Sequence, residues 1–210
     1  MAASIVKIIT RSFPNPVRVT DRFHIQQLAF DAVQELRIKY RWEAIEQENQ
    51  QMLEAKRLEI AYKPEELSNG DTPKQLLERS QYLLFKCKSK WTPSQAKRAE
   101  ILFEKCPLLK DADDLAMKLG YIFDKTLNKG GAFTQLAQWY NKVEKSGIET
   151  FQTVARSIQL HYITILNFFN NQSTNAAAES FNAKIKAFLA ASRGVRNISF
   201  FLFRLSKIYA

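Results

Sequence analysis

The sequence predicts a mainly α-helical fold, in which a long helical block interrupts a small part of an α/β core. Three observations lead to this prediction. Apolar residues recur at three- and four-residue steps through most of the chain. Two helix-start signals follow one another in the middle, and only one short stretch has strand character. With 46% hydrophobic and 25% charged residues among 210, the chain has enough apolar mass for a core.

The N-terminal part is expected to hold the strand. Residues 2–12 could form a short amphipathic helix, and the β-branched run 16–20, Pro16-Val17-Arg18-Val19-Thr20, predicts a short strand. A long helix is expected from about Phe23, because apolar residues share one face while charges fill the other. It continues through the polar stretch 46–51, which resembles a protruding helix more than a buried one.

Two copies of one capping signal start the next helices. Thr72-Pro73-Lys74-Gln75 and Thr92-Pro93-Ser94-Gln95 each place threonine at the N-cap, proline at the first helical position and glutamine at the third. This is a capping box with proline where a helix tolerates it best.

Five later helices are expected. The first spans about 108–127, the second runs from Phe133 to Gly147 after a break at Gly130-Gly131, and the third spans about 148–169. The fourth begins after an N-cap at Asn175, and the fifth spans 198–209. The resulting division is a partial core over 1–48, an all-helical insertion over 49–168, and terminal core helices over 169–210. The alternative is one helical bundle in which 16–20 is merely an extended loop.

Charge and cysteine usage restrict the function classes. The formal charge is +10, and residues 151–210 alone carry seven basic residues and one acid. A one-signed tail suits nucleic acid, although a basic surface also serves solubility. Two cysteines and two histidines without metal-ligand spacing argue against a disulfide scaffold and a zinc site. We expect a cytoplasmic location and no membrane partner, since no apolar run reaches the roughly 18 residues of a membrane span.

The single acid of the tail is Glu179, near the start of the helix that Asn175 would cap. At helical spacing Asn182 and Lys186 share its face, while Phe181 and its apolar neighbours lie on another. Glu179 could hold a metal ion beside a polyanion. A carboxylate at a helix N-terminus is also favoured by the helix dipole, so both interpretations stay open.

The basic residues of the tail are candidate phosphate contacts. Such contacts are independent of sequence and are weakened by salt. The candidates are Arg193, Arg196, Arg204 and Lys207. The terminal helix that carries some of them can equally be a packed helix with a solvated basic edge.

Two end motifs together resemble bacterial insertion-sequence transposases of the DDE class, in the branch whose ribonuclease H-like core is interrupted by a helical insertion. The resemblance spans essentially the whole chain. Its residues are Val19-Thr20-Asp21-Arg22-Phe23-His24 at one end, and Ser173-Thr174-Asn175, Glu179-Ser180-Phe181-Asn182, Lys184-Ile185-Lys186 and Arg193-Gly194-Val195-Arg196-Asn197 at the other.

This resemblance implies DNA cleavage and strand transfer in the transposition of an insertion sequence. Three carboxylates would hold two divalent ions, Mg²⁺ or Mn²⁺, that activate the attacking oxygen and stabilise the leaving one. Glu179 fits the position of the third carboxylate. Lys184, Lys186, Arg193 and Arg196 would then lie close to the DNA. The partners would be the DNA of the element ends and the target, near the nucleoid, with a homo-oligomer left open and no small-molecule substrate.

The resemblance leaves two roles for Asp21. It could be the second catalytic acid, or it could belong to an accessory D-x-x-H element with His24, which is the interpretation we favour. The family's first catalytic aspartate has no counterpart in the chain, so we expect a C-terminal portion of a transposase that is inactive alone. The alternatives are a regulatory DNA-binding fragment and a helical protein-interaction module.

Overall fold

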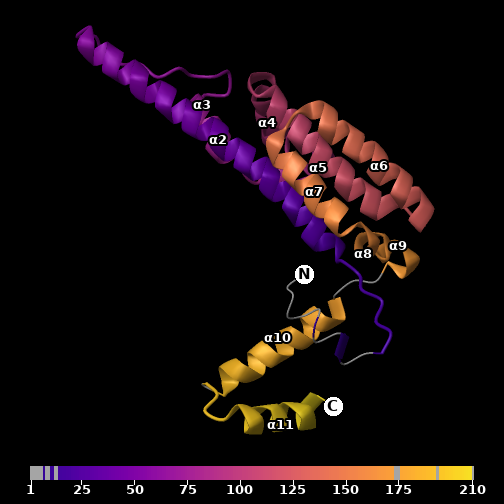
Figure 1. Cartoon of the computed structure of the whole chain (residues 1–210). Coiled ribbons are helices and arrows are strands. Elements are labelled where there is room, and N and C mark those ends of the chain that lie inside the picture. The colour runs from indigo at the N-terminus through magenta and orange to yellow at the C-terminus, as the bar shows by residue number, and fades with distance from the viewer. Residues whose placement is uncertain (1–6, 8–9, 12–13, 173–175, 193, 210) are drawn as a thin grey trace. The chain divides into compact units, whose positions relative to one another are not determined.

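The computed structural model describes residues 7, 10–11, 14–172, 176–192 and 194–209. The chain divides into two compact units, residues 1–171 and residues 172–210, which we call unit 1 and unit 2 (Figure 1). Unit 1 contains the α-helices α2 (Arg22–Arg57), α3 (Pro73–Arg79), α4 (Pro93–Lys105), α5 (Pro107–Lys125), α6 (Lys129–Ser146), α7 (Glu149–Leu160), α8 (Tyr162–Leu166) and α9 (Phe168–Asn171), and the 3₁₀ turns η1 (Leu83–Phe85) and η2 (Lys88–Lys90). Unit 2 contains α10 (Ala176–Ala191) and α11 (Ile198–Tyr209).

The prediction of a mainly α-helical chain is confirmed, but the predicted strand over 16–20 is wrong. The residues that the structure describes form no β-strand. The segment is extended and lies against α8 and its flank: Thr20 N–H donates to the Thr164 carbonyl at 2.9 Å, and the Asn167 side chain donates to the Arg18 carbonyl at 3.0 Å. A β-branched run becomes a strand only beside another strand, and this run has a helical neighbour instead.

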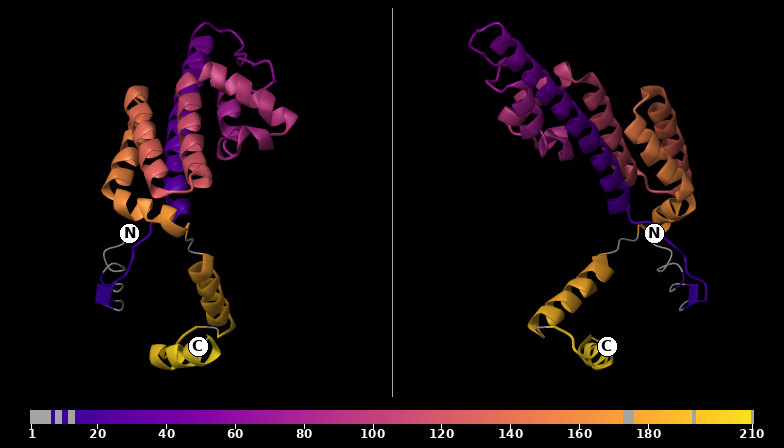
Figure 2. Two further views of the ribbon diagram at one scale, coloured as in Figure 1. Left: turned by 90° about the vertical axis from the view of Figure 1, so that its right-hand side faces the viewer. Right: turned by 60° about the vertical axis from the view of Figure 1, so that its left-hand side comes forward.

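Helix α2 is the 36-residue backbone of unit 1, as the sequence predicts. Its residues at four-residue steps, Ile25, Ala29, Val33 and Arg37, are all buried. They face α5 and α3, and α7 lies beside them. Figures 1 and 2 show that the C-terminal half of α2 extends beyond the ends of α5 and α7. The helix passes residue 48 without a break, and the division of the chain at 48 and 168 stays a prediction.

Both predicted capping boxes are present. The Thr72 hydroxyl accepts from the Gln75 N–H, and the Gln75 side chain accepts from the Thr72 N–H, with the same arrangement at Thr92 and Gln95. At the start of a helix some backbone N–H groups have no partner within the helix, and the two capping boxes supply partners for four of them.

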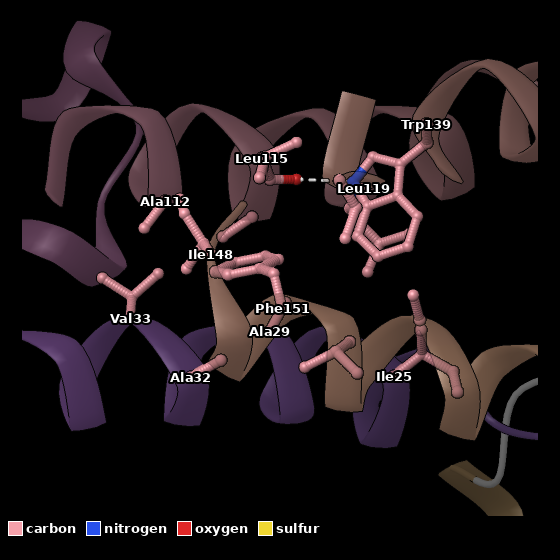
Figure 3. Close-up of a cluster of buried hydrophobic side chains, with 14 of the residues drawn as sticks. Ile25, Ala29, Ala32, Val33, Ala112, Leu115, Leu119, Trp139, Ile148 and Phe151 are labelled. Atoms are coloured by element: carbon pink, nitrogen blue, oxygen red, sulfur yellow. Dashed lines mark hydrogen bonds between the residues drawn. The ribbon is translucent and has the colours of Figure 1, made fainter. Parts of the chain in front are cut away.

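The core of unit 1 lies between α2, α5, α6 and α7 (Figure 3). Trp139 is fully buried, and its indole N–H donates to the Leu115 carbonyl at 2.9 Å. Phe151, also fully buried, comes from α7 into the same cluster. Burial of large aromatic side chains supplies most of the stabilisation in such a cluster.

Two predicted boundaries need correction. The break at Gly130-Gly131 lies a little earlier, because Asn128 caps α6 and accepts from the Gly131 N–H at 2.7 Å, so both glycines belong to the first helical turn. The single helix expected over 148–169 is three helices, since the chain leaves helical geometry at His161. This bend brings Phe168 and Phe169 to within 5.7 and 5.3 Å of the Phe123 ring.

Gly147 closes α6 where the sequence predicts. Its φ of 65° is left-handed, which glycine adopts without steric cost. The short helix expected over 2–12 and the N-cap expected at Asn175 lie largely or wholly outside the described residues.

Candidate nucleic-acid interface

Helix α10 carries the acid of the basic tail. Glu179 lies in its first turn and is exposed. Because α10 is a regular helix through Ala191, Asn182 and Lys186 follow on the face of Glu179 at three- and seven-residue steps. The helix therefore presents a carboxylate, an amide and an ammonium group in one row on its exposed side.

The two lysines of α10 point in different directions. At 100° per residue, Lys186 lies about 20° from Glu179 around the helix axis, whereas Lys184 lies about 140° away. Lys184 is closer to the side of Phe188, which is half-buried. The sequence groups these lysines into one motif, but the helix divides them between the acidic face and the side that packs on α11.

Helix α11 begins after a sharp turn. Gly194 has φ 109°, a conformation that favours glycine. Asn197 then caps the helix, since its side-chain oxygen accepts from the Phe200 N–H at 3.0 Å. Arg196, exposed, stands at this helix start. The candidate Arg193 lies outside the described residues.

The contact between α10 and α11 is aromatic. The Phe188 and Phe201 rings stack with centroids 5.3 Å apart. The Arg204 guanidinium lies 5.2 Å from the centre of the Phe188 ring, and the Lys207 ammonium lies 5.8 Å from that of Phe203. These cation–π contacts fix exposed cations on the surface of unit 2. Sequence reasoning selected Arg204 but missed its aromatic support, which the pairing of α10 with α11 creates.

The other candidates, Asp21 and His24, lie in unit 1. Asp21 is the N-cap of α2 and accepts from the Phe23 N–H at 2.8 Å. His24 is exposed, with its ring edge-on to Phe23 at 6.1 Å. Asp21 therefore has a structural function that accounts for an acid at this position. Its function in catalysis, and that of His24, stays a prediction.

The donor chemistry of the Glu179 face fits a hard divalent ion. Carboxylate and amide oxygens are ligands that Mg²⁺ prefers, and Mg²⁺ is commonly held by one or two carboxylates together with substrate phosphates. Among the described residues there is no group of three or more His, Cys, Asp or Glu side chains that could hold a metal ion. Glu179 and Asn182 are thus a partial ligand set of suitable chemistry.

The surface charge of unit 2 is strongly one-signed. Residues 172–210 hold six basic residues and one acid.

None of the described helices is long and apolar enough to cross a membrane.

Comparison with known proteins agrees with the sequence motifs. A family model described as a transposase, DDE_Tnp_ISL3, matches residues 1–205. No curated protein and no solved structure gives a significant match. Because the family model covers nearly the whole chain, the protein belongs to this transposase family.

Proposed function

We propose that this chain contributes Glu179 to the metal site of a transposase that cuts and joins DNA at the ends of an insertion sequence. The observation that supports the proposal best is the row on α10: the only acid of residues 151–210 is exposed in the first helical turn, with Asn182 and Lys186 on its face. Membership of the transposase family agrees with this function.

The chain's own residues would bind and orient DNA. Lys186 would hold a phosphate beside Glu179, and Arg196 and Arg204 would hold phosphates farther along the backbone. A divalent ion bound by Glu179 would supply Lewis-acid stabilisation at the reacting phosphate. Asn182, an amide on the same face, would donate a hydrogen bond to a phosphate oxygen.

Glu179 does not suffice for a two-ion site. Such a site takes several carboxylates, and Glu179 is the only acid in unit 2. We therefore expect no strand transfer from the chain of 210 residues alone. Magnesium-dependent cleavage of DNA by this chain would contradict that expectation.

The experiment is a transposition assay in a bacterial host that carries a marked element. The substitutions are made in a complete transposase that contains this chain, and that protein is the only transposase in the host. Glu179→Gln should abolish transposition while the affinity for end DNA changes less than twofold, because the variant keeps the size of the side chain and loses only the ligand charge. Glu144→Gln is the matched control, since Glu144 is also an exposed helical acid but lies on α6. Transposition by Glu179→Gln at the control rate would overturn the proposal.

A second function, regulation without catalysis, is favoured by the excess of cations in unit 2. Six basic residues can bind DNA without any metal. In that case, expression of the 210-residue chain beside the complete transposase should lower transposition, and Glu179→Gln in the added chain should not relieve the inhibition.

A further inference from the structure

The C-terminal half of α2 has two unlike faces. One face is covered: Arg37 donates to the Leu77 carbonyl at 2.8 Å, Arg41 pairs with Glu78 at 3.2 Å, and Glu48 pairs with Lys74 at 2.5 Å. These contacts hold α3 against the helix. A neighbouring side of the helix, centred about 80° around its axis from these contacts, carries a row of mostly exposed residues.

This row, which we call the α2 stripe, is mostly apolar and mostly exposed. Trp42 is 63% exposed, Met52 48% and Ile38 44%, while Ile45 is half-buried. Asn49, the fifth member, is exposed as well. The stripe runs along the same part of α2 that carries the contacts to α3. Large apolar side chains in a continuous row on a projecting helix are typical of an interaction surface.

The spacing of the stripe identifies the geometry of its partner. Its members follow one another at steps of four, three, four and three residues, which is the alternation of d and a positions in a coiled coil. Trp42 and Asn49 take a positions, and the other three take d positions. A single asparagine at an a position is a known determinant of register and of pairing between like helices.

The flanking charges suit two parallel copies of the same helix. In a parallel pair, a g residue faces the e residue five positions on in the other helix. Here the g residue is Arg41 and the e residue is Glu46, so two such copies would form this ion pair twice. Glu46 is exposed, and the Arg41 side chain is 35% exposed beside Glu78.

We propose that the α2 stripe is the contact between two copies of this chain, which pair as a short parallel coiled coil. Like residues then meet in every layer, so Asn49 bonds to its own counterpart and is not placed opposite an apolar residue. Isolated helices of two heptads are marginal. In this protein, however, α2 is already ordered by its packing on unit 1, so the entropic cost of forming the helix does not oppose pairing.

Sedimentation equilibrium of the full chain tests the proposal. The wild-type chain should be a dimer at micromolar concentration, and Trp42→Glu should weaken dimerisation by roughly thirtyfold or more, as expected for a central aromatic anchor. Leu127→Glu is the matched control, because Leu127 is 79% exposed but lies between α5 and α6. It should dimerise as wild type does. A monomeric wild type, or a Trp42→Glu variant that still dimerises, would overturn the proposal.

Disulfide cross-linking tests the register independently of overall association. In a Cys87→Ser background, which removes the exposed cysteine, Asn49→Cys should form an intermolecular disulfide on mild oxidation. Gln50→Cys, one residue along and at a b position, should not. Absence of the Asn49→Cys cross-link, as in an antiparallel pair, or equal cross-linking at both positions would contradict the parallel arrangement. Circular dichroism of each variant should show unchanged helicity.

Discussion

Unit 1 and unit 2 differ in how their helices are held. Unit 1 buries a continuous apolar core with Trp139 and Phe151 at its centre. In unit 2 no described side chain is fully buried, and the two helices meet through the stacked rings of Phe188 and Phe201. Charge also distinguishes unit 2, whose ionisable side chains are nearly all of one sign, with six basic residues and one acid. The buried core is thus in unit 1, whereas Glu179 and the candidate phosphate contacts are in unit 2.

The largest expected effect is on the core of unit 1. Trp139→Ala should lower the free energy of unfolding by about 3–5 kcal/mol, because it creates a cavity and leaves the Leu115 carbonyl without its indole donor. Urea unfolding followed by circular dichroism measures this. Tyr82→Ala, at an exposed position, is the control, and an equal effect in both variants would show that the cluster in Figure 3 is not the stabilising core.

The next effect concerns a buried acid of the same unit. Asp113 on α5 is inaccessible, and among the residues that the structure describes neither carboxylate oxygen has a hydrogen-bond partner. Desolvation raises the pKa of Asp113 from 3.8 to about 7, with a smaller contribution from Asp114 in the same direction and an opposing one from Lys88.

Between these two pKa values the unfolded chain loses the Asp113 proton while the folded chain keeps it. The free energy of unfolding should therefore fall by about 4 kcal/mol as the pH rises from about 4 to above 7. Asp113→Asn should flatten this dependence. Unfolding midpoints measured across this range would contradict the account if wild type and variant changed in parallel.

A smaller effect is expected at the helix starts. Thr92→Ala removes the hydroxyl that accepts from the Gln95 N–H, and should cost about 1 kcal/mol of unfolding free energy. Thr92→Ser keeps an acceptor and should recover most of that loss. Both values come from the same urea titration, and a serine variant as unstable as the alanine variant would exclude the capping explanation.

The smallest effect on global unfolding is expected in unit 2. Phe201→Ala should change the main transition by less than about 0.5 kcal/mol, because this half-buried ring stacks on Phe188 within unit 2. Amide hydrogen exchange in α11 should instead become faster, since the stack on Phe188 is lost. Slow exchange in α11 of the variant would mean that unit 2 is held by other contacts.

Local signals predicted much of this fold. The capping boxes at Thr72 and Thr92 form as expected, because each needs only residues within one turn. The strand at 16–20 and the unbroken helix over 148–169 were wrong for a common reason. Both outcomes depend on distant partners, Thr164 for the first and Phe123 for the second, that local propensity does not contain.

The candidate site was only partly predictable. Helical spacing correctly groups Glu179 with Lys186, since it depends on α10 alone. The support of Arg204 by Phe188 requires two helices to meet, so no single-helix pattern reveals it. The burial of Asp113 could have been anticipated, because this acid shares the apolar face of α5 with Leu109 and Ala116.

The most direct test of the division between the units is the salt dependence of DNA affinity. We compare the wild-type chain with a triple variant of unit 2, Lys186→Gln, Arg196→Gln and Arg204→Gln, and with a matched triple variant of exposed lysines in unit 1, Lys97→Gln, Lys110→Gln and Lys145→Gln. The slope of log affinity against log salt should decrease by about 2.7 in the unit 2 variant, at about 0.9 per lost phosphate contact, and stay unchanged in the unit 1 variant. Equal decreases in both variants, or a larger one in the unit 1 variant, would contradict the assignment of DNA binding to unit 2.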